Sequence, residues 1–104
     1  MKRAVRRRAR AEVELLAHVE HIAEHDPTAA LRFVDAVEAA LTLIAEFPEL
    51  GAPYESSNPR LRGLRRWVLP RFPNYVLFYQ IDDEVVHLLH VFHGASDYDP
   101  SADG

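Results

Sequence analysis

The strongest constraint on the fold is a pair of apolar stripes with helical spacing, separated by a single Asp-Pro step. The first stripe consists of Ala11, Leu15, Val19 and Ile22. The second and longer stripe consists of Ala30, Phe33, Val34, Val37, Leu41 and Ile44. Spacings of three and four residues place each set on one side of a helix. The sequence therefore predicts two amphipathic helices, and each needs a further surface to cover its stripe.

The residues at the ends of these patterns predict where the helices begin and end. The first pattern runs from about Ala9 to the Asp26-Pro27 step. Asp26 is typical of a helix N-cap, and Pro27 suits the first helical position because its missing N–H needs no partner there. Phe47-Pro48 ends the second pattern. So short a connection between two helices predicts an antiparallel hairpin.

The C-terminal half supplies the surface that the helices need. Residues 48–59, PELGAPYESSNP, carry three prolines, a glycine and two serines, which predicts a loop. Strand-like runs follow at Leu61 to Leu69, Tyr75 to Ile81 and Val85 to His93. We expect turns at residues 71–74 and at Asp82-Asp83. The last run, VVHLLHVF, is apolar on both faces, which favours a central strand over an edge strand.

Residues 2–7 alternate weakly around Val5 and predict an edge strand, where charged side chains oppose unwanted pairing. The expected fold class is α+β with the order β-α-α-β-β-β. In this fold the antiparallel helix hairpin packs on one face of a small, mostly antiparallel sheet. The chain has 104 residues, and we expect residues 1–97 to form a single domain and residues 98–104 a polar C-terminal tail.

Composition excludes several classes of protein. The sequence has no cysteine, so a disulfide framework, a thiolate zinc site and a cysteine nucleophile are all excluded. Its apolar runs are much shorter than the roughly 18 residues that span a bilayer. The basic N-terminus MKRAVRRRAR lacks the apolar stretch of a signal peptide, so we expect a cytoplasmic protein without a membrane partner.

The net charge of −4 conceals a strong segregation of charge. Of the twelve basic residues, six lie within residues 1–10 and five within residues 60–71. This distribution argues against general nucleic-acid affinity and allows one local anion-binding face.

The second basic segment is predicted to bind a target or partner. Its members are Arg60, Arg62, Arg65, Arg66, Trp67 and Arg71. Arginines beside an aromatic ring can bind phosphates and stack on bases, or they can bind an acidic protein surface. The alternative is an ordinary solvated surface. On a strand, Arg62 and Arg66 would share one face, with Arg65 and Trp67 on the other.

The stretch HVFHGASDYD, residues 90–99, brings histidine, serine and aspartate together. A nucleophilic triad draws its three side chains from separated segments, whereas neighbours on an extended chain point in different directions. No Gly-x-Ser-x-Gly elbow surrounds Ser96. We therefore do not assign a serine hydrolase.

Histidines along the first helix raise the alternative of a metal site. His18, His21 and His25 lie along one side of this helix and could bind a divalent ion together with Glu14. A helix surface or core edge is the favoured interpretation. We therefore expect neither a metal nor a cofactor.

Histidines on the last strand raise the alternative of acid–base chemistry. Strict alternation places His87 and His93 on one face and His90 on the other, so the three cannot form a single site. One of them could act as an acid or base. A histidine satisfied within the sheet is the favoured interpretation.

From about Val5 to Asp97, the order of elements resembles the RelE/ParE superfamily of toxins from type II toxin–antitoxin modules. The resemblance rests on HIAEHDPTAALRFVDAVEAAL, on FPELG after the second helix, and on LRRWVLPRFPNYVLFYQIDDEVVHLLHVFHG. Within these segments the matching features include Ala-Ala-x-x-Phe, a Pro-x-x-Gly loop, Phe-Pro-x-Tyr and a closing Val-x-His-Gly. The resemblance implies a small sheet with a helix hairpin packed against it, which agrees with the periodicity.

The resemblance also implies a function. ParE-like members block DNA gyrase through protein contact, whereas RelE-like members cut messenger RNA on the ribosome, and an antitoxin holds both inactive. For a ribonuclease, the resemblance implies that Arg62, Arg65 and Arg71 supply positive charge. It also implies that His90 or His93 acts as acid or base.

Two departures from the family pattern favour the gyrase-type activity. The closing motif is commonly His-Gly-x-Arg-Asp, but here Ser96 takes the place of the arginine. His90 likewise occupies a position that is often arginine. We therefore expect a growth-inhibiting toxin of a plasmid-stabilisation module, with a cognate antitoxin and DNA gyrase as partners and no direct sequence-specific DNA binding. The alternatives are a ribosome-dependent endoribonuclease acting on mRNA, and a non-toxic binding module on the same fold.

Overall fold

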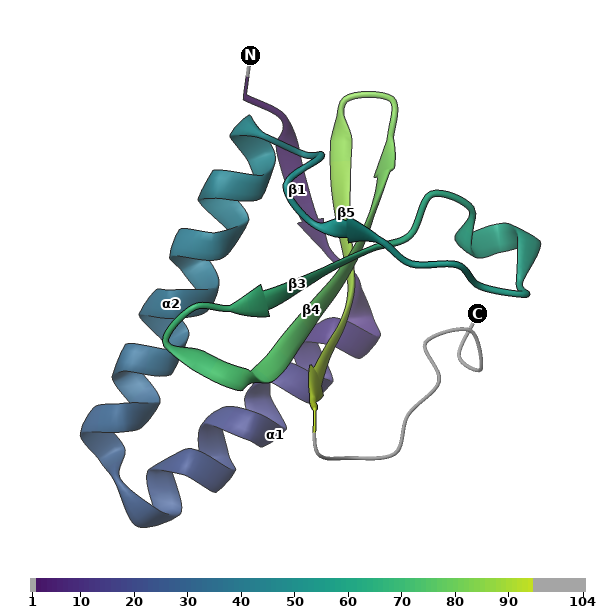
Figure 1. The fold of residues 1–104 in the computed structure, drawn as a ribbon. Coiled ribbons are helices and arrows are strands. Elements are labelled where there is room, and N and C mark those ends of the chain that lie inside the picture. Colours follow the sequence, from purple (N-terminus) through teal and green to yellow (C-terminus); the bar gives the residue numbers. More distant parts are fainter. Residues whose placement is uncertain (1, 95–104) are drawn as a thin grey trace.

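The chain forms two helices and five strands within residues 2–94, the part that the computed structural model describes (Figure 1). The elements are β1 (Ala4–Arg7), α1 (Ala9–His25), α2 (Pro27–Glu46), β2 (Ala52–Pro53), a short 3₁₀ helix (Pro59–Leu61), β3 (Arg65–Leu69), β4 (Phe72–Asp82) and β5 (Val85–His93). Each helix and strand predicted from the sequence is present, and β2 is additional. Ser96, Asp97 and the predicted tail, residues 98–104, lie outside the described residues.

The helix hairpin forms as its end residues predict. The Asp26 carboxylate accepts a hydrogen bond from the Ala29 N–H at 3.1 Å, which caps α2, and Pro27 occupies its first turn. Asp26 is the single residue between the two helices. The chain therefore reverses at once, and α1 and α2 lie next to each other (Figure 1).

The five strands form one sheet in the order β1-β5-β4-β3-β2. β1 runs parallel to β5, and every other pair of neighbours is antiparallel. β1 is an edge strand and β5 lies inside the sheet, and both placements confirm the sequence prediction. The helices cover one face of this sheet, called here the helix face, and leave the opposite far face to the loops (Figure 1).

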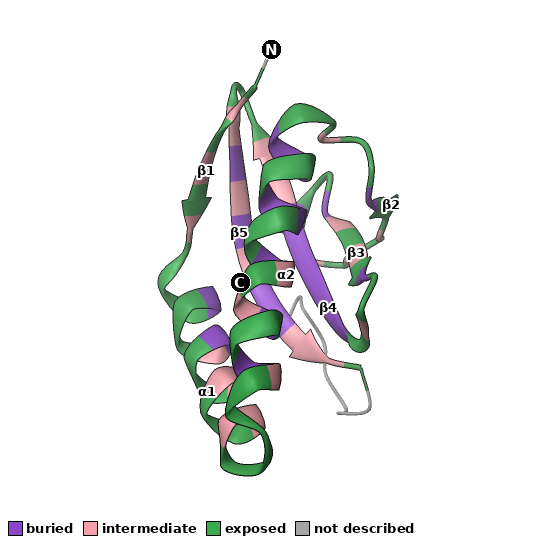
Figure 2. Cartoon of the chain, turned by 90° about the vertical axis from the view of Figure 1, so that its left-hand side faces the viewer, coloured by how far each residue is buried: buried purple, intermediate pink, exposed green. Residues whose placement is uncertain are grey.

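The main core lies between α2 and the helix face. Phe33, Val37 and Ile44 of α2 pack with Leu77 and Tyr79 of β4, and all five are almost inaccessible to solvent. Figure 2 shows the buried segments concentrated in β4 and β5 and on the inner side of α2. Full burial of one such side chain contributes about 1.5–3 kcal/mol, so this contact fixes α2 on the sheet.

A second, smaller apolar cluster covers the far face and corrects one predicted strand. Val76 and Phe78 of β4 pack there against Leu61 and Leu64. The strand predicted to start at Leu61 begins only at Arg65, because a 3₁₀ helix ends at Leu61 and the chain then turns. Gly63 has a φ of +77° in this turn, a conformation that favours glycine.

The predicted turns are displaced by one to three residues. The first lies at Pro70-Arg71, and the predicted turn residues 72–74 belong to β4. The β3–β4 register shifts after Val68, which leaves Pro73 outside the regular ladder, where its missing N–H costs nothing. The second turn lies at residues 83–84, one residue later than predicted. β2 arises within the predicted loop by pairing with the start of β3.

A β-bulge in β5 makes the predicted faces of the late histidines wrong. Phe78 pairs with His90 whereas Tyr79 pairs with Leu88, so Leu89 is the extra residue. Beyond this extra residue, the side chains of β5 that would have pointed to one face of the sheet point to the other. His87 and His90 consequently share the far face, and His93 lies on the helix face.

The Tyr79 hydroxyl fixes the loop between α2 and β2. It donates to the Pro48 carbonyl oxygen at 2.6 Å and accepts from the Gly51 N–H at 2.8 Å. This approach requires glycine, because a Cβ at residue 51 would stand 2.8 Å from the Tyr79 ring and 2.9 Å from the Arg66 carbonyl oxygen. Burial raises the pKa of Tyr79, against smaller opposing effects of the Gly51 N–H and the Arg65 guanidinium.

Tyr79→Phe should lower the free energy of unfolding by about 1–3 kcal/mol, because it leaves the buried Gly51 N–H without its partner. Urea unfolding at neutral pH measures this loss. Burial raises the folded-state pKa, so the hydroxyl's contribution is complete below the unfolded value of about 10 and is lost as pH rises through the folded value. The control Tyr54→Phe should change stability by less than about 0.5 kcal/mol. Equal losses in the two variants would contradict this role for Tyr79.

Candidate partner-binding groove

The structure separates the predicted arginine group. The Arg65 guanidinium donates to the Gly51 carbonyl oxygen at 2.7 Å and to the Glu49 carbonyl oxygen at 3.2 Å, so it holds the loop after α2. Arg71 lies in the turn between β3 and β4, beside α2. Arg60 and Arg62 lie at and just after the 3₁₀ helix. These arginines therefore form no single basic patch.

Of the two predicted pairs of residues sharing a strand face, one is correct and one is wrong. Arg65 and Trp67 pair with Tyr79 and Leu77 and share the helix face, as predicted. Arg66 pairs with Phe78, which places it on the far face. The predicted shared strand face of Arg62 and Arg66 is wrong, because Arg62 precedes the strand.

His90 is held at the edge of β5 by contacts with α1. Its side chain is buried, and its Nδ1 lies 3.1 Å from the Glu14 carboxylate. The same carboxylate accepts a hydrogen bond from the Val91 N–H at 2.9 Å. The His18 Nε2–H donates to the Val91 carbonyl oxygen at 2.7 Å. Two side chains of α1 thus bond the β5 backbone where β1 no longer pairs with it.

The five residues considered for a ribonuclease are spread over several segments and over both faces of the sheet. They are Arg62, Arg65, Arg71, His90 and His93. His93 packs edge-on against Tyr75 on the helix face, with ring centroids 4.9 Å apart, and burial raises the pKa of Tyr75. His90 lies across the sheet, bonded to Glu14. The described chain therefore does not bring this set together around one reacting position.

The helix histidines take separate roles. His18 bonds the sheet, while the rings of His21 and His25 contact each other with centroids 5.6 Å apart. Within residues 2–94, no three histidine, aspartate or glutamate side chains are grouped as a metal site. In the same part of the chain, no helix combines the length and the apolar character needed to cross a membrane.

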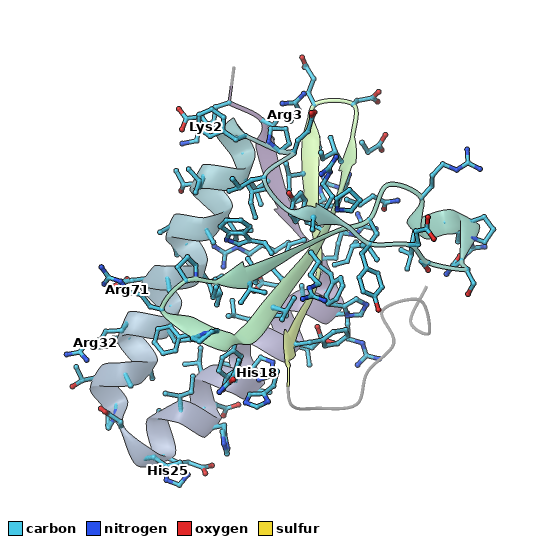
Figure 3. All side chains as sticks on the ribbon, viewed as in Figure 1. Lys2, Arg3, His18, His25, Arg32 and Arg71 are labelled. Carbon is cyan, nitrogen blue, oxygen red and sulfur yellow. The ribbon has the colours of Figure 1, made fainter. Side chains whose placement is uncertain are left out.

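A groove of about 410 Å³ opens between α2 and the β3–β4 turn, and we call it the α2–β3 groove. Its lining residues are Arg32, Asp35, Ala36, Ala39, Ala40 and Leu43 from α2, with Trp67, Pro70 and Arg71 from the sheet side. The small alanine side chains of α2 leave open space beside the Trp67 indole. Figure 3 shows Arg32 and Arg71 on the same side of the molecule, projecting outward from α2 and from the turn.

A second hollow at the sheet edge shares one lining residue with the groove. This hollow, of about 500 Å³, is lined by residues of β3 and of the loop before it, with Trp67 common to both cavities. Large apolar side chains that line the two cavities remain accessible: Leu43 is 39% exposed, Leu50 36% and Val68 37%. Exposed apolar groups beside charged ones are typical of a protein-binding surface.

Part of this site follows from the sequence prediction and part does not. Trp67 and Arg71 line the groove, and Arg66 lines the adjoining hollow. The helical wall was missed, although its signal is present: Arg32, Ala36, Ala39 and Leu43 recur at helical spacing beside the core stripe. A stripe of small residues gives a weaker periodicity signal than the neighbouring stripe of large apolar residues, so it was not predicted as a binding surface.

Two solved structures share this fold, and both are described as toxin–antitoxin systems or complexes. One is the chromosomal ParDE toxin–antitoxin system from P. aeruginosa, with a TM-score of 0.71 and 18% identity over 88% of this chain and 96% of that chain. Another is the toxin–antitoxin complex RelBE2 from Mycobacterium tuberculosis, with a TM-score of 0.61 and 25% identity over 89% of this chain and 99% of that chain.

The model of the family described as the ParE toxin of the type II toxin–antitoxin system, parDE, matches residues 5–98. The chain therefore belongs to the ParE toxin family. A comparison with curated proteins finds no match. The resemblance to the RelE/ParE superfamily, carried by the helix hairpin and the strand motifs, is confirmed.

Glu14→Ala should lower the free energy of unfolding by about 1–3 kcal/mol, because it leaves the buried His90 and the Val91 N–H without their acceptor. Hydrogen exchange of the Val91 amide should accelerate in the same variant. The matched control is Glu20→Ala, an exposed position on the same helix, with a change of less than about 0.5 kcal/mol. Unchanged protection of the Val91 amide in Glu14→Ala would show that α1 does not complete this edge.

Proposed function

We propose that this ParE-family toxin inhibits growth by binding a protein target, DNA gyrase, through the α2–β3 groove. The observation that carries the proposal is the groove itself, whose lining combines the apolar side chains of Leu43 and Trp67 with the charged side chains of Arg32, Asp35 and Arg71. Apolar side chains mixed with charges of both signs suit a protein surface or a helix better than they suit a polynucleotide backbone.

The same groove supports a role for a cognate antitoxin. Both solved relatives are described as toxin–antitoxin systems or complexes. An antitoxin segment that combines apolar side chains with carboxylates would match Leu43, Trp67 and the two arginines. We propose that the antitoxin neutralises the toxin by covering the groove that the target needs.

Ribosome-dependent cleavage of mRNA is the alternative activity. Such chemistry requires an acid or base within hydrogen-bond reach of the reacting group, and cations around the phosphate. His90 is buried against Glu14, and Arg65 is bonded to two backbone carbonyls. These contacts favour structural roles for both residues, and therefore favour the gyrase-type activity.

Inducing the toxin alone in a bacterial host tests the choice between the two targets. We expect growth arrest accompanied by an SOS response and by loss of negative supercoiling in plasmid DNA. Immediate arrest of translation with cleaved messages would replace gyrase with the ribosome as the target. Normal growth at good expression would overturn both activities and favour a non-toxic binding module.

A matched pair of variants on α2 tests the role of the groove. Leu43 is 39% exposed and lines the groove, whereas Leu31 is 69% exposed and lies outside its lining. Leu43→Asp should weaken toxicity by about tenfold or more, the effect of losing one interface contact worth about 1.4 kcal/mol. Leu31→Asp should remain as toxic as wild type. Circular dichroism confirms that both fold, and full toxicity of a folded Leu43→Asp would exclude the groove.

A further inference from the structure

The two basic segments of the sequence meet on the far face of the sheet. Arg8, next to the end of β1, and Arg60, in the 3₁₀ helix, line one open cavity of about 430 Å³. The remaining lining includes Gln80, Asp82, His87 and Leu89. Residues 52 positions apart in the chain thus border the same space, through pairing of β1 with β5 and of β5 with β4. We call this space the His87 cavity.

Strand register extends the positive charge of this cavity. Arg6 of β1 is the cross-strand partner of His87, and His87 is in turn the partner of Gln80. Cross-strand partners share a face, so these three side chains form a row across the far face. The Gln80 side-chain N–H groups donate to the Arg60 and Arg62 carbonyl oxygens at 2.9 and 2.7 Å. Gln80 therefore fixes the segment that carries Arg60 against the sheet.

The lining of the His87 cavity also contains one carboxylate, that of Asp82. The His87 Nε2 lies 3.9 Å from the Asp82 carboxylate, and the His87 side chain is only 18% exposed. Arg8 and Arg60 are exposed at the rim. Guanidinium groups bind phosphate oxygens bidentately, and a carboxylate accepts hydrogen bonds from sugar hydroxyls. Leu89 adds an apolar surface on which a sugar or base can rest.

We propose that the His87 cavity binds a ribonucleotide, with its phosphate between Arg8 and Arg60 and its ribose hydroxyls toward Asp82. An acidic peptide fits less well, because Asp82 repels a second carboxylate but accepts from a hydroxyl. The cavity lies on the far face. Trp67, which pairs with Leu77, and the α2–β3 groove lie on the helix face. The ribonucleotide site is therefore independent of the groove and of the target that binds there.

Calorimetric titration of the full chain with AMP tests the site. Arg8→Gln and Arg60→Gln should each weaken AMP binding by about tenfold or more, the loss expected for a charge-assisted phosphate contact. The control Arg62→Gln makes the same charge change two residues from Arg60, outside the cavity lining, and should leave the affinity within about twofold. Deoxy-AMP lacking the 2′-hydroxyl should bind more weakly than AMP, as should inorganic phosphate.

Four results would overturn the proposal. The first is absence of AMP binding at millimolar concentration, and the second is equal AMP affinity in Arg60→Gln and Arg62→Gln. The third is binding of an RNA oligonucleotide without any binding of AMP, which would indicate an extended nucleic-acid surface instead of a nucleotide site. Equal affinity for AMP and inorganic phosphate would remove Asp82 from the site and reduce it to an anion-binding patch, which also contradicts the proposal.

Discussion

The fold depends on how the backbone N–H and C=O groups of the interior strand β5 find hydrogen-bond partners along both sides of the strand. On one side it pairs with β4 over most of its length, but β1 pairs only with residues 85–88 on the other side. Beyond this point, Glu14 and His18 of α1 bond the Val91 backbone. Buried backbone groups need partners, so this contact locks α1 against the sheet. Since only Asp26 separates the helices, the position of α1 also restricts that of α2.

The position of α2 determines the candidate site. Phe33, Val37 and Ile44 face the core and hold α2 on β4. The adjacent stripe of α2 is consequently turned toward Trp67 and the β3–β4 turn, where the α2–β3 groove forms. Tyr79 fixes the loop after α2 through the Pro48 carbonyl and the Gly51 N–H, which aligns the end of the helix with the sheet edge. The groove is thus a direct product of the core.

Local signals predicted most of the architecture. The Asp26-Pro27 step and the two apolar stripes predict both helices because capping and periodicity act within a few residues. The positions of the arginines and histidines required long-range information. Strict alternation misplaced His93 relative to His87, because the β-bulge at Leu89 depends on pairing with β4. Arg65 looked available on a strand, but its guanidinium bonds carbonyls of a loop that comes earlier in the chain.

Inhibition of purified DNA gyrase distinguishes a protein-binding toxin from a ribonuclease. We propose that this ParE-family chain acts by binding a protein and not by cutting RNA. A supercoiling assay with relaxed plasmid, ATP and gyrase, titrated with the toxin, should show dose-dependent loss of supercoiled product. Addition of the cognate antitoxin should restore it. Full supercoiling at saturating toxin, together with cleavage of mRNA on purified ribosomes, would contradict the gyrase proposal and identify a ribonuclease.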